Sequence, residues 1–228
     1  FNYTLGGSRS YLKTPLQLIN LPQGGLPFYG AVLFGALAAW LYIRRHGLDV
    51  RLVFDAAAPA LLVGQAVVRP ANFINQELYG PPTDLPWGIK IDAVNRIPPW
   101  DNLARFPLET TRFHPAFAYE ILWNLLATGV LLWAFLEFKK KIKPGSIFAG
   151  WLVLEGVGRQ LIEFFRPDQP LVPGTLISYS RVAAGLMILV GLIILLVQYE
   201  IIRLPFLEPG PDEYELSPEA QGKGKVQG

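Results

Sequence analysis

The amino-acid sequence predicts an all-α polytopic membrane protein with about five visible transmembrane helices. Hydrophobic residues make up 51% of the 228 residues and the mean hydropathy is +0.31, whereas charged residues make up only 17%. A soluble domain carries about 25% charged residues. The deficit is concentrated in five apolar segments, each long enough for the roughly 20 residues that a spanning helix needs.

These five segments define the predicted bundle. In chain order they are Leu26–Ile43, Leu52–Val68, Pro115–Phe138, Ser146–Phe165 and Ile177–Ile202. The first contains no charged residue. The second carries Asp55 near one end and Gln65 near the other, and a re-entrant segment is an alternative to a full span there. The third and fourth contain charged residues, which hydrocarbon tolerates only when they are paired or face a polar ligand.

Basic residues at the ends of three segments predict the orientation in the membrane. Arg44 and Arg45 follow the first segment, a lysine cluster at 139–143 follows the third, and Arg203 follows the fifth. Because short basic loops lie on the cytoplasmic side, we expect these three ends there. The opposite side then receives an external arm, 1–25, the loop 70–114 and the turn 166–175.

The loop 70–114 is too long for a plain connection and predicts a small external head on the transmembrane bundle of 26–203. Its Trp87–Asp92 run alternates with a period of two, which favours a short strand. Trp100, after two prolines, is expected at the membrane interface. The tail 204–228 is rich in proline, glycine and charge, so we expect a disordered cytoplasmic C-terminus.

Composition excludes several kinds of site. The chain has no cysteine, which rules out disulfides, thiolate metal sites and a cysteine nucleophile. Its two histidines cannot build a metal site without carboxylates, so we expect no metal and no other cofactor. A net charge of +2 is too small to predict nucleic-acid binding. No signal peptide is expected either, since no basic start precedes a short apolar core.

A dense polar cluster follows the second apolar segment directly. Arg69, Asn72, Asn75 and Glu77 fall where a membrane helix would end. Ionisable residues at membrane depth are a hypothesis of function by default. The two asparagines have a simpler alternative, since side chains spaced by three residues also cap a helix or a turn.

Further polar residues occur at the same predicted membrane level. They are His114, Tyr119, Arg159, Glu163 and Arg166. Glu155, Arg159, Glu163 and Arg166 fall on one helical face, which must point into the bundle. An internal ladder of ion pairs is one interpretation. The other is a lipid site, because two arginines at headgroup depth suit bidentate recognition of a phosphate.

Two weaker signals have structural alternatives. Gly24, Gly25 and Gly30 flank the first span and favour either close approach of a ligand or plain helix packing. His114 precedes Pro115, a residue suited to the first helical position, so the imidazole is either a cap or a proton carrier.

The motifs together resemble the phosphatidylglycerol–prolipoprotein diacylglyceryl transferase family. The family signature is Gly-Arg-x-Gly/Ala-Asn-Phe-(apolar)-Asn-x-Glu-x-x-Gly. Val68 replaces its first glycine, and the positions that match are Arg69, Ala71, Asn72, Phe73, Ile74, Asn75, Glu77 and Gly80. The segments 24–30, 114–120 and 158–166 resemble further family motifs, and the similarity covers about residues 9–200.

Three positions depart from the family pattern. Tyr29 stands where many members have a histidine that is often assigned an essential role, Arg181 where glutamine is usual, and Glu155 where tyrosine is common. The family also has about seven spans, so the resemblance implies that the first two are absent ahead of Phe1.

The resemblance implies transfer of an sn-1,2-diacylglyceryl group from phosphatidylglycerol to the lipobox cysteine thiol of a prolipoprotein. The reaction would occur at the outer face of the bacterial cytoplasmic (inner) membrane and release glycerol-1-phosphate. Catalytic roles carry over to Arg69, Arg159, Glu77, His114 and Tyr29. Substrate-binding roles carry over to Asn72, Asn75, Gly80, Tyr119, Glu163, Arg166, Gly24 and Gly25.

The residue types fit that chemistry. Arg69 and Arg159 suit the charge that grows on a phosphate leaving group, while Asn72 and Glu77 suit orientation of the arginines or of the glycerol headgroup. His114 or Tyr29 is the candidate acceptor of the thiol proton, because thiolate is the nucleophile.

Two other functions remain as alternatives. A non-catalytic relative, acting as a lipid-binding or structural membrane subunit, is motivated by the residues at positions 29, 155 and 181. A small transporter is disfavoured, since its charges would lie near the bilayer midplane rather than near one face.

Overall fold

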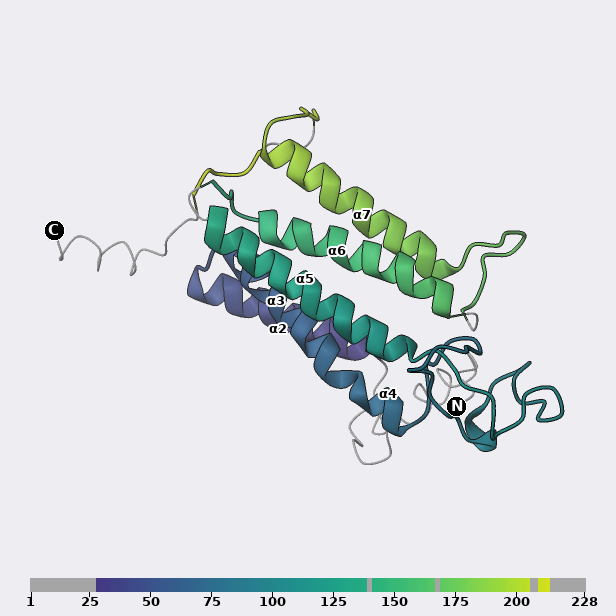
Figure 1. Cartoon of the computed structure of the whole chain (residues 1–228). Helices are drawn as coiled ribbons and strands as arrows, with labels where there is room; N and C mark the ends of the chain where they lie inside the picture. Colours follow the sequence, from purple (N-terminus) through teal and green to yellow (C-terminus); the bar gives the residue numbers. More distant parts are fainter. Residues whose placement is uncertain (1–27, 139–140, 167–168, 206–208, 214–228) are drawn as a thin grey trace, which may run out of the picture. The chain divides into compact units, whose positions relative to one another are not determined.

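The computed structural model describes residues 28–138, 141–166, 169–205 and 209–213. The chain divides into two units, Phe1–Leu48 and Asp49–Gly228. The described part of the first unit is helix α2 (Phe28–His46), and the second unit holds the remaining helices (Figure 1). Helices dominate, and the described residues form isolated β-bridges but no sheet. The helical fold class is therefore confirmed for this part of the chain.

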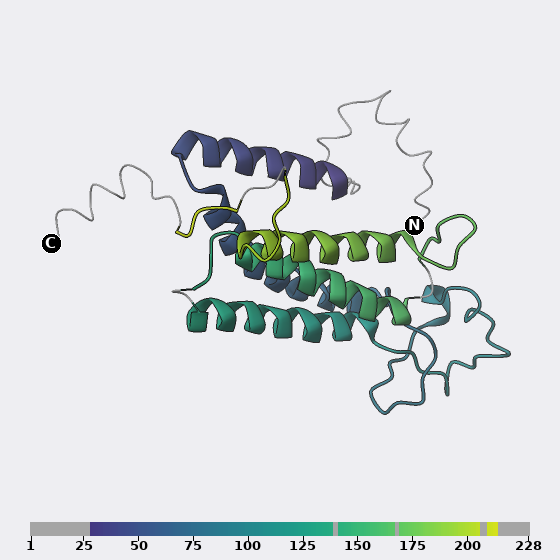
Figure 2. The same ribbon diagram turned by 90° about the horizontal axis from the view of Figure 1, so that it is seen from above.

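The second unit is a helical bundle with a loop-rich head. Its helices are α3 (Val50–Val68), α4 (Pro70–Ile74), α5 (Ala116–Phe138), α6 (Ser146–Ile162) and α7 (Tyr179–Gln198), with short 3₁₀ turns η3 (Ala93–Asn95) and η4 (Glu163–Phe165). Figures 1 and 2 show α3, α5, α6 and α7 running side by side along the unit. Helix α6 contacts α3, α5 and α7, so it packs against every other long helix of the second unit.

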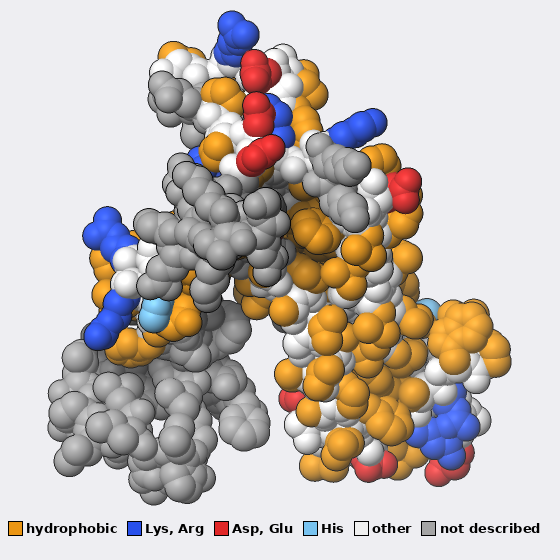
Figure 3. Space-filling model, turned by 90° about the vertical axis from the view of Figure 1, so that its left-hand side faces the viewer, with side chains coloured by type: hydrophobic (Ala, Val, Ile, Leu, Met, Phe, Trp, Pro, Cys, Tyr) orange, Lys and Arg blue, Asp and Glu red, His pale blue; other side chains and the backbone are white. Residues whose placement is uncertain are grey.

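Three stretches of the described chain are long and apolar enough to cross a membrane. They are Val50–Ile74, Ala116–Phe138 and Tyr179–Gln198. Large side chains on them point outward, with Leu122 66% and Leu126 61% exposed, and Figure 3 shows wide hydrophobic areas on one face. Lipid rather than water is the natural surrounding of such a surface. Helices α2 and α6 occupy the other two predicted spans but are not among these three stretches.

The second predicted span is one continuous helix. Helix α3 runs through Pro59 without a break, which argues against the re-entrant alternative. Buried Asp55 explains the charge in this span: its Oδ2 accepts from the Gly145 amide at 2.8 Å and its Oδ1 from the Phe148 amide at 2.7 Å. A carboxylate suits the first turn of a helix, where amides lack partners. Asp55 thus fixes the start of α6 against α3.

Two expectations for the head are wrong in detail. The Trp87–Asp92 run does not form a strand; within it only Ile89 makes a bridge, to Phe113. Trp100 is not an exposed interfacial anchor, because it is 7% exposed and packs in a core with Tyr79 and Phe113. The aromatic core stabilises the head without a strand ladder. The predicted arm 1–25 and most of the predicted tail lie outside the described residues.

Small residues set the spacing between helices in the bundle. A Cβ on Gly156 would lie 2.6 Å from the Ala184 carbonyl oxygen, and one on Gly191 would lie 2.7 Å from the Ala149 carbonyl oxygen. Only glycine allows α6 and α7 to approach this closely. Gly158 faces the other way, where a Cβ would lie 2.1 Å from Trp123 Nε1.

Replacing Gly158 with alanine should destabilise the bundle by about 1–3 kcal/mol, as overpacking of a tight core does. The added methyl would displace the Trp123 indole, which donates to the Leu154 carbonyl at 3.0 Å. Gly129→Ala in α5 is the matched control, because no atom lies within 4 Å of a Cβ there. Unfolding followed in detergent with increasing denaturant should separate the two variants. Equal stability would contradict the packing described.

Candidate functional site

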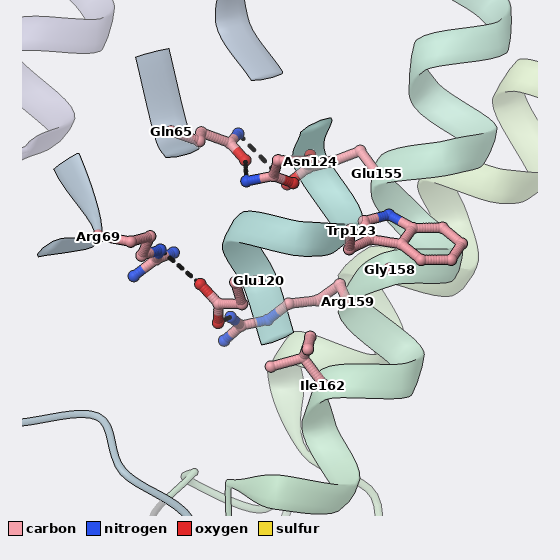
Figure 4. Close-up of a pocket in the computed structure, with 9 residues that line it drawn as sticks. All are labelled: Gln65, Arg69, Glu120, Trp123, Asn124, Glu155, Gly158, Arg159 and Ile162. Carbon is pink, nitrogen blue, oxygen red and sulfur yellow. Dashed lines mark hydrogen bonds and ion pairs between the residues drawn. The ribbon is translucent and has the colours of Figure 1, made fainter. Parts of the chain in front are cut away.

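A single buried carboxylate joins the two arginines that the sequence placed at one membrane level. Glu120 of α5 has its Oε2 2.5 Å from Nε of Arg69 and its Oε1 3.8 Å from Nη1 of Arg159 (Figure 4). The Glu120 side chain is 9% exposed. Three helices, α3, α5 and α6, therefore bring two guanidinium groups onto one shared carboxylate.

Further contacts from α7 and the preceding turn orient Arg159. Its Nε donates to Ser180 Oγ, and its Nη2 donates to Gln169 Oε1 at 3.2 Å. Glu163 Oε2 lies 4.0 Å from Arg159 Nε, within ion-pair range but too far for a hydrogen bond. That oxygen is buried and has no hydrogen-bond partner among the described residues, so it remains available as an acceptor.

Arg69 is supported by the polar residues that follow it in the sequence. Its Nη1 donates to Asn72 Oδ1 at 3.4 Å, and Asn72 Nδ2 donates to Glu77 Oε1 at 2.9 Å. Asn75 Nδ2 reaches the same Glu77 oxygen at 3.2 Å. The asparagine side chains thus bind Glu77. Asn72 therefore contacts Arg69 directly, Glu77 holds Asn72, and neither of these two residues lines the cavity beside the arginines.

The cavity beside the arginines is small. Its volume is about 30 Å³, enough for about two water molecules at about 10–15 Å³ each. The lining residues are Gln65, Arg69, Glu120, Trp123, Asn124, Glu155, Gly158, Arg159 and Ile162. A lipid headgroup does not fit this volume, so any such ligand requires side-chain movement.

A second polar chain borders the cavity deeper in the bundle. Asn124 Nδ2 donates to Gln65 Oε1 at 3.2 Å, and Gln65 Nε2 donates to Glu155 Oε1 at 3.3 Å (Figure 4). Three different helices supply these residues. The interpretation of a ladder of ion pairs along one helix face does not account for the hydrogen bond of Glu155, which Gln65 of α3 donates.

His114 belongs to a separate group at the start of α5. Its Nδ1 lies 2.9 Å from the Tyr119 hydroxyl, to which the Trp87 indole N–H donates at 2.8 Å. Phe165 packs against both rings, at centroid distances of 5.1 and 5.0 Å. A Cβ on Gly80 would lie 2.9 Å from the His114 Cβ, so glycine is needed for this contact. The group joins the head to α5 and η4.

Burial lowers the pKa of His114 below its usual value of 6.5. The imidazole is then neutral at pH 7, the form that accepts a proton. A lowered pKa also means that protonation opposes folding: the stabilisation is complete above pH 6.5 and is lost as pH falls through the folded-state pKa.

We expect NMR to observe that shift directly. The chain has two histidines, so in a His46→Gln variant labelled with ¹⁵N-histidine every imidazole signal belongs to His114. Its midpoint should lie below pH 6.5. A midpoint at or above 6.5 would contradict the burial of the ring.

The remaining predicted residues are Tyr29, Gly24, Gly25 and Arg166. Tyr29 is the second residue of α2 in the first unit, and Gly24 and Gly25 lie outside the described residues. Arg166 follows η4 and donates its backbone amide to the Glu163 carbonyl at 3.1 Å. The sequence reasoning overlooked Glu120, Gln65, Asn124, Gln169, Ser180 and Trp87 as partners. A charged residue inside an apolar span was the available signal for Glu120.

Comparison with known proteins identifies the family. The family described as Prolipoprotein diacylglyceryl transferase matches residues 1–197. The chain belongs to this family. Curated relatives with the name phosphatidylglycerol–prolipoprotein diacylglyceryl transferase agree: the protein of Gloeobacter violaceus is 41% identical over 167 residues, and that of Bifidobacterium adolescentis is 42% identical over 157.

The curated relatives are longer than this chain. The matched regions cover 72% and 67% of the chain, but 59% and 46% of the two relatives. For Chloroflexus aggregans, at 37% identity, the shares are 69% and 54%. The chain therefore spans about half the length of the curated relatives it matches. No solved structure matches it.

Proposed function

We propose that the chain transfers the diacylglyceryl group of phosphatidylglycerol to the lipobox cysteine thiol of a prolipoprotein. Its relatives have the name phosphatidylglycerol–prolipoprotein diacylglyceryl transferase. The observation that carries the proposal is the pair of guanidinium groups on Glu120. Two arginines from separate helices suit a phosphate diester at the depth of lipid headgroups.

The reaction needs charge stabilisation on the leaving group. The cysteine sulfur attacks the glyceryl carbon next to the phosphate, a C–S bond forms, and the C–O bond breaks with its electron pair on the phosphate. Arg69 and Arg159 meet that growing charge in a partly buried site, where fixed donors are more effective than in bulk water. The products are the thioether and glycerol-1-phosphate.

Glu120 is the counterion of both arginines before substrate arrives. Because the cavity is only about 30 Å³ in volume, a phosphate enters only if Glu120 or an arginine shifts. Asn72 and Glu77 hold Arg69, while Gln169 and Ser180 hold Arg159. Each guanidinium can therefore turn from Glu120 to phosphate while its other contacts persist.

The thiol proton needs an acceptor. Neutral His114 is one candidate, although its Nδ1 already faces Tyr119. Glu163 Oε2 is another, since it is buried and accepts no hydrogen bond from the described residues. Tyr29 is a poor base at pH 7, because a phenol has a reference pKa near 10; we assign it to shaping the substrate pocket.

The decisive experiment for this function is a transfer assay. Purified protein, labelled phosphatidylglycerol and a lipobox peptide should yield a diacylglyceryl peptide and one glycerol-1-phosphate per thioether. A peptide with serine in place of the lipobox cysteine is the control and should yield neither product. Bound phosphatidylglycerol without transfer would favour the non-catalytic lipid-binding alternative.

We further propose that the protein lies in the bacterial cytoplasmic membrane with the loop 70–114 outside and the C-terminus inside. The chain has no cysteine, so single-cysteine variants report orientation without background. An impermeant maleimide should label Asp101→Cys in intact cells and Lys141→Cys only after lysis. The reverse pattern would contradict the positive-inside assignment.

A further inference from the structure

A second concave surface lies on the other side of the α6–α7 contact. Its volume is about 560 Å³, and it is lined by Gln160, Phe164, Ile177, Arg181, Val182 and Gly185. The lining is mostly apolar, and Phe164 is 70% exposed and Ile177 48%. The groove is therefore open to the surroundings of the bundle.

Arg181 is the charged residue of this groove. Its guanidinium carbon lies 4.8 Å from the centre of the Phe164 ring, a cation–π contact that fixes the side chain. Its Nε is buried and has no hydrogen-bond partner among the described residues. None of the described residues that line the groove carries a carboxylate. An uncompensated charge at membrane depth is costly, so such residues usually mark a ligand path.

The groove and the arginine cluster share a wall. On α6, Arg159 reaches the cluster while its neighbour Gln160 lines the groove. On α7, Ser180 accepts from Arg159 while its neighbour Arg181 faces the groove. Gln160 Nε2 donates to the Arg181 carbonyl at 2.9 Å, and this hydrogen bond connects α6 to α7 within the shared wall. Arg181 therefore lies at the same level along the bundle as Arg159.

We propose that this groove binds an anionic phospholipid from the bilayer, with its phosphate on Arg181 and an acyl chain along Val182 and Gly185. The positive charge selects the headgroup, and the apolar walls accept the chain. The occupant is a lipid and not free phosphate, because the groove is mostly apolar. Its assignment as a docking place for phosphatidylglycerol next to the reacting cluster rests on the proposed function, whereas the binding itself does not.

A fluorescent reporter in the groove tests the proposal. A Cβ on Gly185 would meet only Gln160 Nε2, at 3.8 Å, so Gly185→Cys labelled with bimane is accommodated. The labelled protein is placed in phosphatidylcholine vesicles that contain a small fraction of phosphatidylglycerol or phosphatidylcholine with a nitroxide on the acyl chain. We expect about a fivefold preference for quenching by phosphatidylglycerol, the effect of one arginine near a headgroup.

Arg181→Gln in the labelled protein should reduce the preference to that of phosphatidylcholine, and Arg181→Lys should retain most of it. Arg203→Gln, an exposed arginine at the other end of the bundle, should leave it unchanged. Equal quenching by both lipids, or a preference that persists in Arg181→Gln, would overturn the proposal. Loss of the preference on addition of inorganic phosphate would also overturn it, since the site would then take free phosphate.

The Arg69→Ala variant separates this inference from the proposed function. Without Arg69 the reacting cluster is disabled, yet the quenching preference should persist, because Arg69 does not line the groove. A preference that disappears with Arg69 would place the lipid in the cluster and overturn the second site. If the parent protein shows the preference but no transfer, the proposed function fails and the lipid site stands.

Discussion

Replacing Arg159 with alanine should lower the rate of diacylglyceryl transfer by about 10²–10³-fold, the loss expected when a main stabiliser of transition-state charge is removed. Arg159 contacts Glu120, Gln169 and Ser180, so its guanidinium is held in place before the phosphate arrives. Initial rates with labelled phosphatidylglycerol and a lipobox peptide measure the effect.

Two controls isolate the role of the guanidinium. Arg159→Lys keeps the charge but loses the planar fork, so it should recover only part of the rate. Arg203→Ala removes an arginine whose side chain is 88% exposed and which lies far from Arg159 in the sequence, so it should change the rate little. Tyr29→Phe should cost at most about tenfold, the value of one hydrogen bond. An Arg159→Ala loss as small as that of Tyr29→Phe would contradict this division of roles.

The variant Glu120→Gln should destabilise the protein by about 3–5 kcal/mol, because it leaves two guanidinium groups without their shared counterion. Added phosphatidylglycerol should restore much of that stability, since a ligand that binds only the folded state stabilises it. Thermal unfolding in detergent, with and without the lipid, measures both the loss of stability and its recovery.

Glu137→Gln is the matched control for this prediction. It removes a carboxylate from the same helix, α5, at an exposed position. Its stability should equal that of the parent and respond to lipid as the parent does. If Glu120→Gln were as stable as this control, Glu120 would not be the counterion of the arginines.

Much of the bundle was predictable because apolar length determines a spanning helix. The predicted Pro115–Phe138 is found as Ala116–Phe138, and Leu52–Val68 as Val50–Val68. The structure of the head was not predictable, since its Trp87–Asp92 run has the alternation of a strand but no partner strand to pair with. Trp100 is buried by Tyr79 and Phe113, and sequence pattern cannot reveal such a cluster of aromatic rings distant in the chain.

The site was predictable in its residue types and not in its pairing. Arg69 and Arg159 share a membrane level in any helical bundle of this order, which is why the sequence brought them together. Their common partner Glu120 depends on the rotation of α5 about its axis, which helix packing determines. The same holds for Glu155, whose partner Gln65 lies 90 residues away.

The most direct test of the central claim is a double-mutant cycle on the two arginines. If Arg69 and Arg159 act together on one phosphate, the transfer rate of the double alanine variant should be close to that of the slower single variant, because residues that act as a unit are strongly non-additive. If the two losses instead multiply, the arginines act independently, and the shared-phosphate account is contradicted.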